Sequence, residues 1–235
     1  MKILAVDTST SMATVAISVD ERIVAESLFN TDRTLSARLV PEILRMLDIA
    51  GVAMSDVDLF AASIGPGSFT GVRGGVATIQ GVALATGKLC VGFSSLSLLA
   101  MNFSLSTYPV CPLIDARKSE VYAALYDCSA PIPVPRLNDC VLSPDALLDR
   151  IVALTGERVI FVGDGAVRYR DQIDDILGDQ AVFAHFPMQT PRASNGILLA
   201  VDAFRGDKLL KPSQLLPVYL RASDAEINRT SASTR

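Results

Sequence analysis

The order of strand and helix patterns repeats within the chain, and this repeat constrains the fold more than any other feature. Apolar patterns at residues 2–6, 14–19 and 22–28 predict three strands, and a helical pattern runs from 35 to 50. A buried strand at 57–64 and a helix at 70–86 complete this unit. The succession βββαβα then begins again at residue 110. We therefore infer an internal duplication.

The second copy reads as strands at 110–114, 120–126 and 136–142, a helix opened by Ser143, a strand at 158–162, a helix ending near 177, a strand near 182–186 and a helix at 194–204. A short strand at 89–91 and a helix at 94–104 complete the first half of the chain. We expect an α/β protein with similar lobes at 1–108 and 109–222 and a flexible tail at 223–235. Two such lobes facing one another across a cleft form the architecture of the actin, Hsp70 and sugar kinase group (ASKHA, ribonuclease H-like), and a single doubly wound sheet is the alternative.

The charged residues are nearly balanced, since 21 Lys and Arg against 25 Asp and Glu give a formal net charge of -4. Such a chain has no overall positive field to attract a phosphate backbone, so any RNA is expected to be held by a partner protein. No apolar run reaches the roughly 18 residues that span a bilayer, and residues 1–9 lack the pattern of a secretion signal. We expect a cytoplasmic protein that does not enter a membrane.

Few residues suit metal or covalent catalysis. The four cysteines are far apart and form no CxxC pair, so we expect buried free thiols. The chain has one histidine, His185, which excludes a zinc site with several His ligands and is expected to be packed within its apolar stretch. No GxSxG motif is present and no pair of carboxylates stands out. We predict no catalytic residue and no metal ligand.

The bend after the first predicted strand carries residues suited to binding an anion, namely Asp7, Thr8, Ser9 and Thr10. Their hydroxyls and backbone amides can face a phosphate, with the carboxylate near magnesium. A Thr/Ser turn that satisfies its own backbone is the alternative. In the second lobe, Asp115 with Arg117 offers a further anion contact, and a charged hairpin turn is the commoner explanation.

The segment GPGSFTGVRGG at 65–75 is the most unusual in the chain. Its glycines allow a ligand to approach the backbone closely, so Gly67 and Ser68 are candidate anion contacts. Thr70 is expected to cap the helix that follows while the free amides face the anion, and Arg73, inside the helix, joins this set. The segment is not a Walker A loop because no GK[ST] ends it.

Small residues recur at three- and four-residue steps along the predicted helix, at Gly71, Gly74, Gly75, Thr78, Gly81 and Ala85. Each interior glycine costs about 1 kcal/mol of helix stability relative to alanine, so close packing against another element is expected to compensate. We predict that this face docks a second subunit together with the apolar stripe Leu39, Ile43, Met46 and Leu47. Packing against the chain's own sheet is the alternative.

The sequence resembles the bacterial TsaB family, also called YeaZ. The similarity rests on ILAVDTST at 3–10, GPGSFTGVR at 65–73, IDAR at 114–117 with EVY at 120–122, and PVYLR at 217–221. These segments occur in the family's order and cover all of the chain except its tail. Two positions depart from the pattern: Leu35 stands where many relatives carry His, which weakens any metal site, and Gly74 stands where a β-branched residue is usual.

The resemblance implies a two-lobed, noncatalytic relative of TsaD, the tRNA threonylcarbamoyladenosine synthase. It implies docking to TsaD through helices of the first lobe, which correspond here to 39–47 and 71–85. With the ATPase TsaE, such proteins support transfer of threonylcarbamoyl to the adenosine beside the tRNA anticodon. They lack the metal-binding histidine pair of TsaD, which agrees with the single histidine here. We therefore expect indirect contact with tRNA, ATP or ADP only at the level of the complex, and a homodimer when the chain is alone.

Two other functions stay open at this point. A stand-alone small kinase or ATPase would use Asp7, Thr8 and Asp115 in its cleft. An M22-type peptidase, a description given to some relatives because of their kinship with TsaD, would need a metal or nucleophile that the sequence does not offer.

Overall fold

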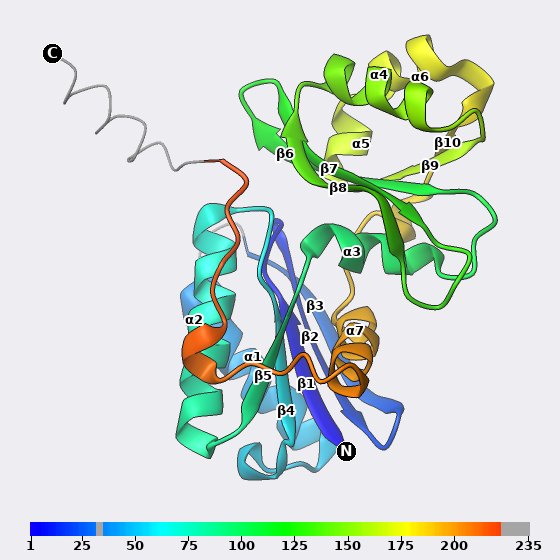
Figure 1. The fold of residues 1–235 in the computed structure, drawn as a ribbon. Coiled ribbons are helices and arrows are strands. Elements are labelled where there is room, and N and C mark those ends of the chain that lie inside the picture. The colour runs from blue at the N-terminus through cyan, green and yellow to red at the C-terminus, as the bar shows by residue number, and fades with distance from the viewer. Residues whose placement is uncertain (32–34, 222–235) are drawn as a thin grey trace, which may run out of the picture.

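The computed structural model describes residues 1–31 and 35–221, so the predicted tail at 223–235 lies outside the described residues. Two lobes, each built on one five-stranded sheet, lie one above the other (Figure 1). This arrangement excludes the single doubly wound sheet. The α/β class and the duplicated lobes that the sequence repeat predicted are confirmed.

The first lobe contains β1 (Lys2–Asp7), β2 (Met12–Val19), β3 (Arg22–Asn30), β4 (Leu59–Ser63) and β5 (Leu89–Phe93), in the order β3-β2-β1-β4-β5. β1, β2 and β3 pair antiparallel, whereas β4 lies parallel to both β1 and β5. β1 and β4 are buried along almost their whole length. Their continuous apolar sequences are therefore those of strands covered on both faces.

The second lobe repeats this topology with β6 (Val110–Arg117), β7 (Glu120–Asp127), β8 (Val134–Leu142), β9 (Val159–Val162) and β10 (Ala181–Phe183), in the order β10-β9-β6-β7-β8. The repeated unit is one strand and one helix longer than the βββαβα of the sequence analysis. β5 and β10 are the extra strands, and each pairs parallel to the strand before it in its lobe.

Helices cover both faces of each sheet. In the first lobe α1 (Leu35–Ala50) and α2 (Phe69–Thr86) share one face, and in the second lobe α4 (Pro144–Leu154), α5 (Asp164–Arg168) and α6 (Arg170–Leu177) do the same (Figure 1). The remaining helices are α3 (Ser95–Ala100) and α7 (Ala193–Arg205). Short 3-10 turns lie at Met54–Asp56, Met101–Phe103, Gly178–Gln180, Phe186–Met188 and Pro212–Gln214. Among the described helices, none combines the length and the apolarity needed to cross a membrane.

The two copies exchange one helix each. α3, from the first copy, buries Leu96 and Leu99 against Val110 and Ile160 of the second lobe. α7, from the second copy, packs Ile197 with the first lobe's β1. The first sheet ends with β5 and the second begins with β6, but each of these helices belongs to the core of the opposite lobe.

Local sequence fixes the ends of α2. The Ser68 hydroxyl accepts a hydrogen bond from the Gly71 amide at 3.2 Å, so Ser68 is the N-cap and the prediction that Thr70 caps the helix is wrong. Gly87 ends the helix in the left-handed conformation, with φ of 67°.

Three side-chain amides hold the crossing between the lobes. The Asn102 amide nitrogen donates to the carbonyls of Met188 at 2.7 Å and Thr190 at 3.0 Å, and its oxygen accepts from Asn195 at 2.8 Å. Gln189 accepts from the Gly163 amide at 2.6 Å. We call Asn102, Gln189 and Asn195 the amide clamp, because they tie the chain on its way back from the second lobe to the end of α3 and the start of α7.

The described chain ends in an extended segment, residues 211–221, that runs along α2 toward the second lobe (Figure 1). Gln80 of α2 donates to the carbonyls of Pro212 and Leu215, and the Val218 amide donates to the Ile64 carbonyl at 2.8 Å. Leu215 is fully buried in the core of the first lobe. The segment, here called the C-terminal strap, reaches the second lobe where Arg221 pairs with Glu120 at 2.8 Å.

Candidate functional site

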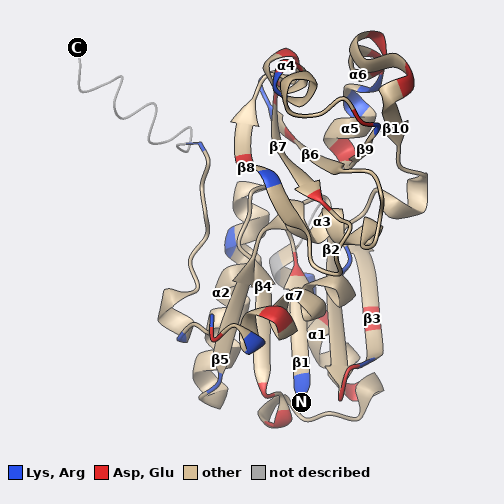
Figure 2. Cartoon of the chain, turned by 45° about the vertical axis from the view of Figure 1, so that its right-hand side comes forward, with Lys and Arg blue, Asp and Glu red and all other residues tan. Residues whose placement is uncertain are grey.

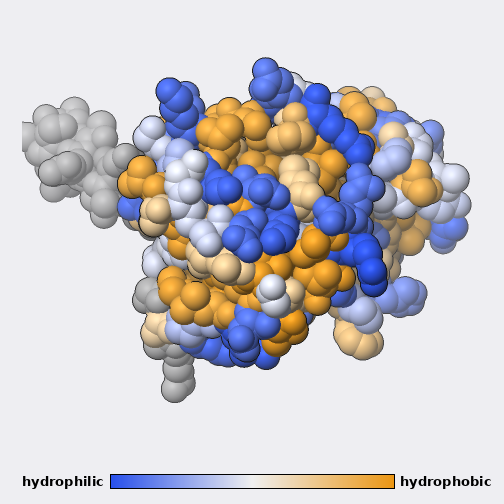
Figure 3. All heavy atoms as spheres, turned by 90° about the horizontal axis from the view of Figure 1, so that it is seen from below, coloured by the Kyte–Doolittle hydropathy of each residue, from blue (hydrophilic) through white to orange (hydrophobic). Residues whose placement is uncertain are grey.

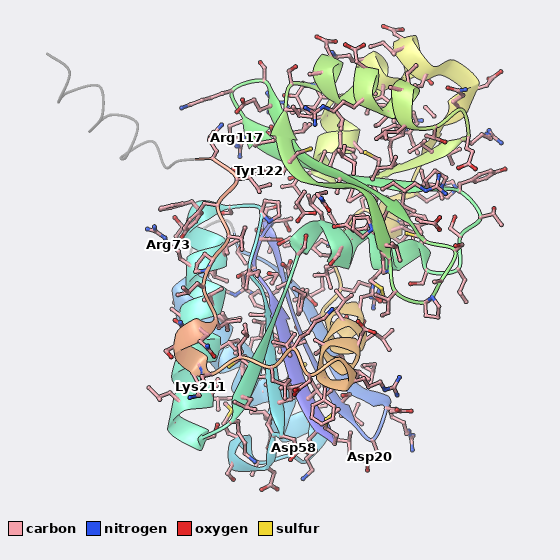
Figure 4. All side chains as sticks on the ribbon, in the orientation of Figure 1. Asp20, Asp58, Arg73, Arg117, Tyr122 and Lys211 are labelled. Atoms are coloured by element: carbon pink, nitrogen blue, oxygen red, sulfur yellow. The ribbon has the colours of Figure 1, made fainter. Side chains whose placement is uncertain are left out.

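A polar cleft of about 510 Å³ separates the lobes at the end of β1 and the start of α2. Residues from both lobes and from the strap line it: Ser9, Thr10, Ser11, Thr31, Gly67, Ser68, Phe69, Asp115, Ala116, Arg117, Tyr122, Asp164 and Arg221. Figure 4 shows Arg117 and Tyr122 together at the upper edge of this region, by the β6–β7 hairpin. The fold thus brings the predicted bend, the glycine-rich loop and the Asp115 turn to one place.

The bend at Asp7 is largely satisfied by the protein itself. Thr8 Oγ1 donates to the Gly71 carbonyl at 2.8 Å, and Thr10 Oγ1 donates to the Met12 carbonyl at 3.0 Å. The Ser68 amide donates to the Ser9 carbonyl at 2.7 Å, which closes the bend onto the glycine-rich loop. Thr8 is therefore unavailable to a ligand and Thr10 forms the local turn that the sequence allowed as an alternative.

Two polar atoms of this bend are buried and have no partner among the described residues, the Asp7 Oδ2 and the Ser9 Oγ. The Asp7 carboxyl is fully buried, and this burial raises its pKa above the ordinary value. Ser9 borders the cleft, but the whole residue is buried, so its hydroxyl is not exposed to a ligand there. Asp7 itself lies behind it and does not line the cleft.

Glycine is required at several positions of the glycine-rich segment because the bend at residues 7–10 packs directly against its backbone. A Cβ on Gly67 would overlap the backbone of Ser9, and a Cβ on Gly71 or Gly75 would overlap Thr8. For these three glycines the packing is internal, which was the alternative reading for Gly71 and Gly75. Gly74 and Thr78 are half-buried, Gly81 and Ala85 are exposed, and no atom lies within 4 Å of a Cβ added to Gly81.

On the side of the second lobe, the cleft is lined by charged residues that pair with one another. Asp115 accepts from Arg168 at 2.9 Å and lies 3.7 Å from Arg117, while its backbone amide donates to Asp164 at 3.0 Å. Burial raises the pKa of Asp164. Arg117, Lys118 and Ser119 all have positive φ, so the β6–β7 turn is tight, as the charged-hairpin alternative required. The paired charges and the backbone amides of this cluster suit binding of a polar ligand.

The predicted docking stripe on α1 is not a surface. Leu39, Ile43, Met46 and Leu47 are 1 to 3% exposed and belong to the core of the first lobe, so the prediction that these side chains dock a partner is wrong. The same helical period that suggested an interface is the one that packs α1 on its own sheet. The residues turned outward are Val40 and Leu44 on α1 and Leu84 on α2, which are 42%, 53% and 74% exposed.

Histidine and cysteine play no visible part at the cleft. His185 is exposed rather than packed, because it precedes the short turn at Phe186–Met188. Cys90, Cys111 and Cys128 are buried free thiols and Cys140 is half-buried, and burial raises the pKa of Cys90 to about 11. Within residues 1–31 and 35–221, no three His, Cys, Asp or Glu side chains gather as metal ligands would.

A second recess, of about 900 Å³, opens at the foot of the first lobe and involves none of the predicted motifs. Ile3, Ile23, Ile197 and Leu198 line it, with Arg205 paired to Glu21 at its rim. Seen from below, apolar areas on this side are interrupted by hydrophilic ones (Figure 3).

The sequence analysis missed a cluster around Arg73. The guanidinium lies 3.7 Å from the centre of the Phe69 ring and 5.3 Å from that of Tyr219, and its Nε donates to the Tyr219 hydroxyl at 2.6 Å. Tyr219 is 146 residues away in sequence, on the strap. Its place in the PVYLR motif was the one available signal.

Comparison with known proteins identifies the family. A family model described as "TsaD: tRNA N6-adenosine threonylcarbamoyltransferase" matches residues 22–229. The "tRNA threonylcarbamoyladenosine biosynthesis protein TsaB" of Escherichia coli is 32% identical, over 94% of this chain and 95% of that protein. The chain belongs to the TsaB family. The protein of the same name from Bacillus subtilis is 28% identical over 96% of both chains.

Solved structures agree with this assignment. "YeaZ from Pseudomonas aeruginosa" superposes with a TM-score of 0.80 at 30% identity, over 93% of this chain and 99% of that one. A more distant likeness, with a TM-score of 0.51 at 11% identity over 86% of this chain and all of the other, is to a ROK hexokinase from Thermus thermophilus. That likeness concerns the fold alone and supports the ASKHA architecture.

Proposed function

We propose that this TsaB-family chain is a noncatalytic subunit that a TsaD and a TsaE protein require for threonylcarbamoyl transfer to the adenosine beside the tRNA anticodon. Family membership supports a role in tRNA threonylcarbamoyladenosine biosynthesis. The noncatalytic part rests on the cleft, where Asp7 is buried, Asp115 is paired with Arg168, and Asp164 accepts from a backbone amide. Asp7 therefore does not reach a ligand in the cleft, and Asp115 is held by a counter-ion.

Docking to TsaD would use the outward face of α1 and α2. We define this outward face as Val40, Leu44, Ala77, Gly81, Leu84 and Ala85, all of them exposed. Adjacent exposed apolar residues indicate an interaction surface, and the small residues of α2 permit a partner helix to approach closely. Gly81 fits this role because nothing lies within 4 Å of its Cβ position.

The chain would act by changing the shape of its partner. Docking that favours the closed, competent form of TsaD raises the population of that form in proportion to the difference in affinity for the two forms. ATP or ADP would then be handled by the complex, and tRNA would be held through TsaD. The charge pattern supports indirect contact, because basic and acidic residues are intermixed on both lobes in the view of Figure 2.

When TsaD is absent, the outward face would pair with a second copy of the same face. Apolar helix surfaces that dock a partner also associate with themselves by mass action. We therefore expect a homodimer in solution that TsaD converts to a heterodimer. Light scattering during titration with TsaD follows this exchange, and a chain that stays monomeric at high concentration contradicts the homodimer.

Threonylcarbamoyl transfer reconstituted from purified components tests the proposed function. Incorporation of threonylcarbamoyl into unmodified tRNA is followed with TsaD, TsaE, the adenylate-forming enzyme, ATP, bicarbonate and threonine, with and without this chain. The proposal expects incorporation only when the chain is present. Equal incorporation without the chain contradicts it.

The variant Gly81→Leu tests where TsaD docks. Its new side chain has room in the monomer, so circular dichroism and melting should match the unaltered chain, while its bulk blocks close approach of a partner helix. Affinity for TsaD is expected to fall at least tenfold. Tight binding by Gly81→Leu would place the interface elsewhere.

A stand-alone ATP-dependent enzyme is the second candidate, favoured by the volume of the polar cleft. ATP turnover by the isolated chain that disappears in Asp7→Ala would support it. The burial of Asp7 speaks against this function, because a carboxylate that does not line the cleft cannot hold a nucleotide's magnesium there.

A further inference from the structure

Arg73 is held in a fixed position on the surface of α2. Its guanidinium is stacked on the Phe69 ring at 3.7 Å, and its Nε donates to the Tyr219 hydroxyl at 2.6 Å. Phe69 and Tyr219 also contact each other, with ring centres 5.4 Å apart. We call these three residues the Arg73 bracket. Figure 4 shows Arg73 on the outer side of α2, pointing away from the molecule.

The bracket immobilises a charge without neutralising it. Arg45, Arg136 and Arg192 each pair with a carboxylate at 2.5 to 2.9 Å. In the described part of the chain Arg73 has no such carboxylate, and only its Nε is bonded. The ring contacts and the Tyr219 hydrogen bond together offset the entropy lost by holding this long side chain in one rotamer. The terminal Nη groups are thus left oriented for an acceptor from another molecule.

The best acceptor for such a group is a planar or tetrahedral anion. A guanidinium fork matches a carboxylate or a phosphate with two parallel hydrogen bonds, and both partners gain from the charge. The residues around the bracket indicate which of these two anions it binds.

The surroundings fit a protein better than a nucleic acid. Leu216, Val218 and Tyr219 of the strap are 61%, 47% and 45% exposed, and Phe69 is 41% exposed. Arginine and aromatic residues within apolar surroundings are the composition of the strongest contacts in protein interfaces. Arg73 also lies one turn before Ala77 and two before Gly81, so it continues the outward face of α2 toward the strap.

We infer that the Arg73 bracket receives a carboxylate of the docking partner and anchors the interface at this end of α2. This inference rests on the proposed docking to TsaD and names the group that orients it. The Tyr219 hydroxyl fixes the direction of the fork, and the strap thereby becomes part of the binding surface. Lysine carries the same charge at this position but cannot make the forked contact.

Affinity of the full chain for TsaD, measured by calorimetry, tests the bracket. Arg73→Lys and Arg73→Gln are expected to weaken binding by about tenfold or more, and Tyr219→Phe by a smaller factor because the ring remains. Arg158→Gln is the matched control, since Arg158 is also exposed and faces a ring, that of Tyr108 at 5.9 Å in the second lobe. This control should bind as the unaltered chain does.

Each result decides a different point. If Arg73→Lys and Arg73→Gln bind TsaD as tightly as the unaltered chain, the bracket is not an anchor, while docking itself stands. If these variants keep TsaD affinity but the complex loses affinity for tRNA, the acceptor is a phosphate and the carboxylate assignment is overturned. If the unaltered chain does not bind TsaD at all, the proposed function fails and the bracket assignment fails with it.

Discussion

Single glycines in α2 perform different tasks although they look alike in sequence. Gly71 is small because the Thr8 carbonyl occupies the place of a side chain, whereas Gly81 faces open space. Glycine at position 71 lowers the stability of the helix, but it allows α2 to pack closely against the bend beside the cleft. At Gly81 no contact within the chain requires glycine, and the open space beside this residue leaves room for a partner.

The substitution of alanine at each position separates these tasks. Gly71→Ala should lower the free energy of unfolding by about 1–3 kcal/mol, because the Cβ collides with backbone that cannot move aside. Gly81→Ala should raise it by about 0.5–1 kcal/mol, because alanine favours the helix and meets nothing. Urea unfolding measures both. Equal effects at the two sites would show that the bend does not press on α2.

The buried Asp7 makes stability depend on pH. Its pKa is raised in the folded state, so the native chain binds more protons than the unfolded chain between 3.8, the ordinary value, and the raised pKa. Stability contributed by the protonated carboxyl is therefore lost as pH rises through this window. Asp7→Asn has no such loss, and its advantage over the unaltered chain in urea unfolding should grow from pH 3.5 to pH 7.

Asp20→Asn is the control of opposite sign. The N-terminal ammonium, 2.6 Å away, lowers the pKa of Asp20, so the unaltered chain gains stability as pH rises past the folded pKa. The advantage of Asp20→Asn over the unaltered chain should then shrink with rising pH. An Asp7→Asn advantage that does not change with pH would mean that Asp7 is ionised in the fold without penalty.

At the level of elements, the sequence predicted the strands and helices well because their signals are local. Alternation and apolar runs place β8 and β9 within two residues of their observed limits, and the Ser143 cap places the start of α4. Two features had no local signal. The exchange of α3 and α7 depends on which face of each sheet the other helices leave uncovered. Helical periodicity alone does not distinguish core residues such as Leu39 and Ile43 from residues of an interface.

The site was predicted in part for the same reason. The motifs that contain Asp7, Gly67 and Asp115 meet at one cleft, although Asp7 itself does not line it. The sequence could not show that Asp7 is sealed behind Ser9 or that Tyr219 reaches Arg73, because both depend on contacts between segments far apart in the chain.

The amide clamp predicts how the crossing between the lobes responds to a mutation. Asn102→Ala removes three hydrogen bonds and leaves two carbonyls without their donor, so the free energy of unfolding should fall by about 1–3 kcal/mol. Amide exchange at residues 184–195 should quicken. Asn138→Ala, on exposed β8, should change neither. Unchanged exchange in Asn102→Ala would mean that the crossing is held by packing alone.

At the scale of the whole molecule, the docking surface and the cleft between the lobes are separate features. The outward face and the Arg73 bracket of the first lobe would meet TsaD, while in the region between the lobes Asp7 is buried and Asp115 is paired with Arg168. The exchanged helices and the strap tie the lobes together. Docking on the first lobe would then be transmitted through a single packed body.

The account's central claim is that docking, and not chemistry in the cleft, is what this chain contributes. Rates of threonylcarbamoyl transfer in the reconstituted mixture, compared for a docking variant and a cleft variant, test it most directly. Leu44→Asp places a charge on the outward face, and Ser9→Ala removes a hydroxyl beside the cleft that has no partner in the described structure. The account predicts that transfer falls at least tenfold with Leu44→Asp and stays unchanged with Ser9→Ala. Full activity with Leu44→Asp and loss with Ser9→Ala would contradict it.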